Sequence, residues 1–141
     1  MMRRFNKKGL SLMEVMVAAL LLSFTLVSIL VLFINSLLMN QSNRNLTTAV
    51  AHGQLVMERI RDTSFSSVAG RINNATWNYN TGDIQANLNS APLVNETVVA
   101  AMPNGIGDPL DVTVTVSWDN QTTSPLMRRR SIVLRTQLTE Y

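Results

Sequence analysis

Residues 15–34 are twenty consecutive positions without a charged residue, a glycine or a proline. As an α-helix, twenty residues span about 30 Å, the thickness of the hydrocarbon core of a bilayer. A helix that is apolar on every side needs lipid or other apolar helices around it. The run therefore predicts a helix that either spans a membrane or lies in the core of an assembly of such helices.

Charged residues flank this run on its N-terminal side. Four cations, Arg3, Arg4, Lys7 and Lys8, lie within the first nine residues, and Glu14 stands directly before the run. Basic residues before an apolar span stay in the cytoplasm, so the chain after about residue 34 is expected to face outward. A carboxylate at the edge of a span is costly and indicates a function, whereas the plain alternative is a solvated glutamate at the membrane interface.

Residues 9–18, Gly-Leu-Ser-Leu-Met-Glu-Val-Met-Val-Ala, resemble the class III signal of type IV prepilins and type II secretion pseudopilins. The resemblance implies that residues 1–9 are a leader, that prepilin peptidase cuts between Gly9 and Leu10, and that the amine of Leu10 is then methylated. It also implies that Glu14 pairs with the freed amine of Leu10 on a neighbouring subunit. A buried carboxylate is tolerated when it is paired, and such a pair specifies register.

The implied partners are prepilin peptidase, other pilins or pseudopilins through the N-terminal helix, and the bacterial inner membrane before assembly. The chain would cross that membrane once with its N-terminus in the cytoplasm, and then enter a pilus or pseudopilus with its head outside.

Two other interpretations of the apolar run were weighed. A secretory signal peptide fits less well, because the run is longer than a usual signal core and its end lacks an Ala-x-Ala site. A plain signal anchor that holds an exported binding domain remains an alternative, although it leaves Glu14 without a role.

The charge balance argues against a nucleic-acid binder once residues 1–9 are set aside. Residues 10–141 hold eight of the twelve cations and all nine carboxylates, a formal charge of −1. Residues 128–130, three consecutive arginines, are interpreted as a solvated loop before the last strand, with contact to a subunit, an anionic lipid or DNA as the alternative. Because the chain has no cysteine, disulfides and thiolate metal sites are excluded.

Helical periodicity continues beyond the apolar run. Seven small or apolar positions between residues 46 and 60 recur three or four apart: Leu46, Ala49, Val50, Gly53, Val56, Met57 and Ile60. This spacing predicts an amphipathic helix with one stripe on a core. We expect one helix from about residue 11 to about residue 62, with residues 10–34 for membrane or filament and residues 35–62 as the amphipathic half.

Residues 63–141 are expected to form a β-rich head. The turn-rich stretch 63–94 offers one or two short strands around Trp77, Tyr79, Ile84 and Leu88. Three further strands are predicted at residues 96–102, 111–118 and 131–139, the last two as an antiparallel hairpin with one apolar face. The fold class is therefore α+β, a long N-terminal helix packed on a small antiparallel sheet.

No catalytic, cofactor or metal site is expected, so the protein is predicted not to be an enzyme. His52 is the only histidine and is interpreted as structural or solvated, without a His-centred triad or metal site. Asp108 and Asp111 provide fewer oxygens than a calcium loop needs, which favours capping aspartates. Trp77 and Trp118 are expected in the core.

The last two strands also resemble those of PilV-type minor pilins and GspI-type pseudopilins, though less specifically than the leader does. Many major pilins carry a proline within the apolar run and a C-terminal disulfide pair, and residues 15–34 contain no proline. The resemblance therefore implies a minor pilin of an initiation or tip complex, with a type II secretion pseudopilin as the alternative.

Overall fold

The structure, a computed structural model, describes residues 11–120 and 128–140. In chain order its elements are α1 (Leu12–Arg61), α2 (Phe65–Asn73), β1 (Tyr79–Asn80), α3 (Thr81–Leu88), β2 (Thr97–Ala101), β3 (Leu110–Asn120) and β4 (Arg128–Leu138). The chain divides into two compact units, Met1–Asn40 and Gln41–Tyr141. The second unit is called the head below.

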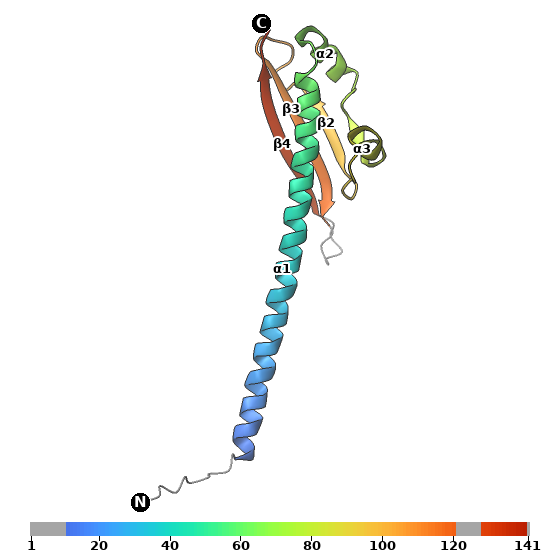
Figure 1. The fold of residues 1–141 in the computed structure, drawn as a ribbon. Coiled ribbons are helices and arrows are strands. Elements are labelled where there is room, and N and C mark those ends of the chain that lie inside the picture. The colour runs from blue at the N-terminus through green and yellow to red at the C-terminus, as the bar shows by residue number, and fades with distance from the viewer. Residues whose placement is uncertain (1–10, 121–127, 141) are drawn as a thin grey trace, which may run out of the picture. The chain divides into compact units, whose positions relative to one another are not determined.

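In the first unit, the described residues form the N-terminal part of α1 (Figure 1). Their large apolar side chains are exposed, with Leu12 79% exposed and Phe24 70% exposed. Within the described residues, α1 is the one helix that is long and apolar enough to cross a membrane by length and composition. The helix predicted from about residue 11 to about residue 62 is confirmed by the bounds of α1, Leu12–Arg61.

The head contains a four-stranded antiparallel sheet in the order β1-β2-β3-β4 (Figure 1). The pairing of β3 with β4 extends from Leu110 opposite Leu138 to Asn120 opposite Arg128. Side chains of β3 alternate between buried and half-buried from Val112 to Asn120. The α+β fold and the three predicted strands are therefore confirmed.

The core lies between the C-terminal half of α1 and the sheet. Ala49, Val56 and Ile60 of α1 are fully buried, as are three valines of β3, Val112, Val114 and Val116. Trp77 and Trp118 are buried as expected. Leu46, in contrast, is 43% exposed, because the preceding turn of α1 meets the polar end of β3, where the Asn45 amide donates to Asn120 Oδ1 at 3.5 Å.

At Gly53, α1 closely approaches the sheet. A Cβ atom at this position would lie 2.6 Å from Leu134 Cδ1 and 3.3 Å from Val116 Cγ2. Glycine disfavours a helix interior. Its place in this helix is explained by the short distance to β4.

Two predictions for the head were wrong. Residues 65–73 form helix α2, and Ile84 and Leu88 lie in helix α3, so that only Tyr79–Asn80 forms a strand in this stretch. Ile84 and Leu88 are four apart and both buried, a helical spacing, and a capping box between Asn80 and Asp83 starts the helix. Residues 128–130 are the first residues of β4 and not a loop before it, because they pair with the extended end of β3.

Candidate functional site

The predicted processing site, Gly9 and Leu10, lies outside the described residues. The description begins at Ser11, which precedes α1. The Ser11 carbonyl accepts hydrogen bonds from the backbone N–H groups of Glu14 and Val15 at 2.9 and 3.2 Å. Ser11 is therefore placed as the cap of the helix, one residue after the predicted new N-terminus.

The Glu14 side chain turns back to this cap. Its Oε2 accepts a hydrogen bond from the Ser11 backbone N–H at 2.9 Å, which satisfies one of the free donors of the first helical turn. A carboxylate is also favoured at this position by the helix dipole. A carboxylate has about four lone-pair sites, so this bond leaves capacity for a further cationic partner.

Three small polar residues lie within the apolar run, where they could contact neighbouring helices. The hydroxyls of Ser23, Thr25 and Ser28 donate to backbone carbonyls of their own helix at 2.8–2.9 Å. Their hydrogens are thus used internally. A neighbouring helix would find only the oxygen lone pairs of these side chains.

The head holds a buried polar network centred on His52. Nδ1 of His52 lies 2.8 Å from Glu96 Oε1, and Nε2 lies 2.7 Å from Ser90 Oγ. The Leu93 backbone N–H donates to Glu96 Oε2 at 2.7 Å. Since Glu96 acts as an acceptor for Leu93, the consistent assignment is that Nδ1–H donates to Glu96 and that the Ser90 hydroxyl donates to Nε2.

This network corrects the expectation that no His-centred triad can be built. One histidine suffices, because the serine and the carboxylate come from the chain between α3 and β2, which packs beside α1. The sequence contained a signal for burial, since His52 adjoins Gly53 and lies three residues after Ala49 on the apolar stripe. It contained no local signal for Ser90 or Glu96, which are 38 and 44 residues away.

The order Ser–His–Glu matches that of a nucleophilic triad, but the burial of the network argues for a structural role. His52 is 1% exposed and Glu96 is fully buried. In such a triad the imidazole must reach the leaving group of a substrate, whereas this ring is covered. The network instead satisfies buried polar groups and joins α1 to the segment between α3 and β2.

Asp111 is bound by side chains rather than poised for calcium. Its carboxylate accepts hydrogen bonds from Gln137 at 3.0 Å, from Arg135 at 2.8 Å and from Asn104. The hydrogen bonds from Gln137 and then Arg135 lower the pKa of the Asp111 carboxyl below 3.8. Asp111 lies in β3 and is not a loop cap as expected. No cluster of three or more metal-ligating side chains occurs within residues 11–120 and 128–140.

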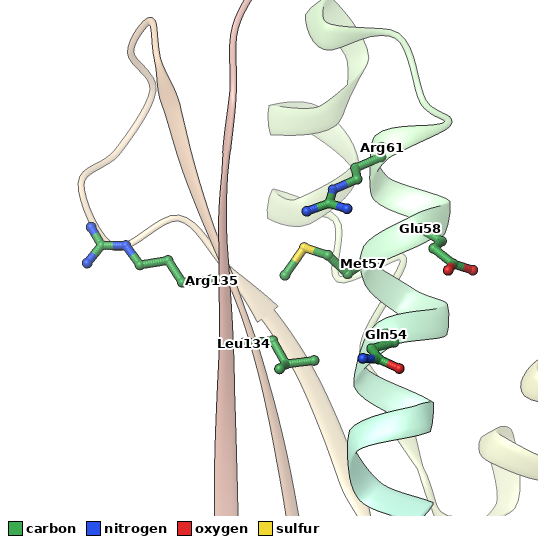
Figure 2. A pocket seen from close by; sticks show the side chains of 6 residues that line it. All are labelled: Gln54, Met57, Glu58, Arg61, Leu134 and Arg135. Carbon is green, nitrogen blue, oxygen red and sulfur yellow. The ribbon is translucent and has the colours of Figure 1, made fainter.

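A groove of about 360 Å³ runs between α1 and β4 (Figure 2). It is lined by Gln54, Met57, Glu58, Arg61, Leu134 and Arg135. Met57 and Leu134 face each other from the two elements (Figure 2). Glu58 and Arg61 have opposite charges, and Arg135 is held by Asp111 at 2.8 Å, so the groove has no single-sign field that would select an ionic ligand.

The chain was compared with known proteins in three ways. No family model, no curated protein and no solved structure matches it. The functional argument therefore depends on the residues and contacts described above.

Proposed function

We propose that the chain is a minor-pilin-like structural subunit, not an enzyme. In this proposal, prepilin peptidase removes residues 1–9 and methylates Leu10, and the subunit moves from the inner membrane into a type IV pilus, in an initiation or tip complex. The resemblance of residues 9–18 to the prepilin signal is the starting point for the proposal.

The observation that carries the proposal is the uncovered apolar surface of α1. All large apolar side chains between Leu12 and Ile34 are at least 46% exposed, and the most apolar window of the helix has a mean hydropathy of 2.8. Burying such surface yields roughly 25 cal/mol for each Å² removed from water. Lipid provides this burial before assembly, and the same helices of sister subunits provide it afterwards.

Glu14 supports assembly over simple anchoring. Its carboxylate satisfies only the Ser11 N–H among the described residues, and removal of residues 1–9 would create an amine one position before Ser11. In an apolar bundle, an unpaired carboxylate is strongly disfavoured and a paired one is tolerated. A neighbouring subunit whose Leu10 amine reaches Glu14 would therefore be held at one register.

A type II secretion pseudopilin shares each of these residues and is the alternative. The two machines differ in their assembly components. Dependence of incorporation on the pilus assembly ATPase or on the secretion ATPase would separate them.

The test is incorporation of a Glu14→Gln variant. Because the chain has no cysteine, one introduced cysteine near the start of α1 can report contact between neighbouring subunits by crosslinking. We expect Glu14→Gln to be cleaved normally but to enter filaments at least about tenfold less, the effect of about 1.4 kcal/mol. Glu58→Gln, an exposed glutamate on the same helix, is the matched control and should assemble like the wild type.

Normal incorporation of Glu14→Gln would overturn the role given to the charge. Normal function of Glu14→Ala without any dependence on the peptidase would favour the signal-anchored binding domain instead.

A further inference from the structure

Four arginines gather at the end of the head where α1 enters it. Arg130 Nη1 donates to Ser42 Oγ of α1 at 3.1 Å. Arg128 pairs with Asn120 across the sheet, and Asn120 in turn contacts Asn45 of α1. Arg44 lies in the same helical turn as these α1 residues.

The arginines surround this end of the head rather than lining one face. Side chains alternate along a strand, so Arg128 and Arg130 lie on the sheet face toward α1. Arg129 lies on the opposite face, where its Nη2 donates to Thr97 Oγ1 of β2 at 3.0 Å. These four arginines, called the collar below, are suited to a broad charged surface rather than to a small ligand.

These cations lack acidic partners in the part of the chain that the structure describes. Of the head's carboxylates, Glu96 is bound by the neutral His52 and Asp111 pairs with Arg135, and residues 121–127 contain no Asp or Glu. Asp119 stands opposite Arg129 in register, but its carboxylate accepts from Asn95 at 2.8 Å. Four cations and one carboxylate leave this end of the head with a surplus of positive charge.

The collar follows the apolar run closely along the chain. Ser42, the contact of Arg130, follows Ile34 by eight residues, which corresponds to about 12 Å of helix. The headgroup region extends roughly 5–8 Å beyond the hydrocarbon core. The helical rise therefore limits the gap between the collar and the headgroups to less than the Debye length of about 8 Å at physiological salt, so an anionic surface attracts these side chains.

We propose that Arg44 and the arginines 128–130 form a binding site for anionic phospholipid headgroups, which holds the head on the membrane before assembly. From the proposed function this inference takes only the insertion of the N-terminal part of α1 in a membrane. Its test needs neither peptidase nor filaments, so failure of the lipid contact and failure of the assembly role can be distinguished.

The test is arginine footprinting of the full chain in nanodiscs made with and without phosphatidylglycerol. Phenylglyoxal modifies accessible guanidinium groups, and mass spectrometry reports the rate at each site. We expect the four collar arginines to react severalfold more slowly in the anionic discs. High salt should abolish the difference, because near 1 M the Debye length is about 3 Å. Arg71, an exposed arginine of α2, is the internal control and should react equally in both discs.

Charge variants complete the test. A basic residue near an anionic surface contributes about fivefold in affinity, so Arg128→Gln, Arg129→Gln and Arg130→Gln together should weaken the contact about 100-fold and remove the protection of Arg44. The corresponding three Arg→Lys changes should retain it. All three positions are exposed, and the fluorescence of Trp77 and Trp118 checks that each variant is folded.

Three results would overturn the proposal. Equal reactivity of the collar in both kinds of disc would show that lipid charge is not recognised. Protection in neutral discs that grows with protein concentration would indicate contact between subunits. Protection that appears only when duplex DNA is added would assign the collar to nucleic acid.

Discussion

Replacing His52 and Glu96 with leucine, singly and together, tests the buried network of the head. Nδ1 of His52 and Oε1 of Glu96 are 2.8 Å apart, and both side chains are almost completely buried. Each single change leaves the other polar group in an apolar interior without its main partner. The double change removes both groups and fills the space with side chains of similar size.

The expected free energies differ between the single and double variants. His52→Leu leaves a buried carboxylate without its main partner, and breaking a buried pair in this way costs about 3–5 kcal/mol. Glu96→Leu leaves both the Nδ1–H of the imidazole and the Leu93 N–H without a partner, and we expect a similar cost. In the double variant only the Leu93 N–H is stranded, which costs about 1–3 kcal/mol. The coupling energy between the two positions should therefore be at least about 3 kcal/mol.

Urea unfolding of the full chain in detergent provides the assay. Both tryptophans, Trp77 and Trp118, are buried in the head, so their fluorescence reports the unfolding of this unit alone. Ser90→Ala serves as the mild control, because Ser90 is only half-buried and its partner loses one hydrogen bond of about 1 kcal/mol. If the destabilisation of the double variant equals the sum of the two single variants, His52 and Glu96 do not form one network.

Three further changes test the packing and electrostatics of the head by the same unfolding assay. Gly53→Val should destabilise it by about 1–3 kcal/mol, since the added atoms meet Leu134, while Gly53→Ala should stay within about 1 kcal/mol of the wild type because helix propensity offsets the crowding. Asn80→Ala removes the cap of α3 and should cost about 1 kcal/mol; no loss would contradict the capping assignment. Hydrogen bonds from Gln137 and Arg135 lower the pKa of Asp111, so the stabilisation by its carboxylate is present above pH 3.8 and is lost as pH falls through the lowered pKa. The difference in unfolding free energy between the wild type and Asp111→Asn should therefore shrink only below pH 3.8. A difference that does not change with pH would contradict this role of Asp111.

Periodicity predicted the elements whose apolar positions repeat over many residues. The helix was recognised because its apolar positions recur at helical spacing from Ala49 to Ile60, and both of these are fully buried. The last two strands were recognised because their apolar positions alternate, and the pairing of β3 with β4 keeps one face on the core. In such long patterns one physical cause, burial on one side, acts at every repeat.

Short elements were missed because their patterns cover few residues. Helix α3 has eight residues and buries only Ile84 and Leu88, and two apolar positions do not separate a helix from a strand. Its clearest signal was the pair Asn80 and Asp83, which form the capping box. The start of β4 was missed because its three arginines lack an apolar face, and pairing with β3 decides their conformation.

The His52 network could not be predicted for a different reason. Its members come from two distant parts of the chain, α1 and the segment between α3 and β2, and the choice of Ser90 and Glu96 depends on where that segment packs. Residue spacing along one element carries no information about such contacts. Moreover, a lone histidine limits metal sites but not hydrogen-bonded networks.

The most direct test of the assembly-subunit account is the intact mass of the protein extracted from membranes of strains with and without prepilin peptidase. We predict the loss of residues 1–9 and the gain of one methyl group, on Leu10, only where the peptidase is present. An unprocessed mass in both strains would contradict the account and leave a signal-anchored exported domain.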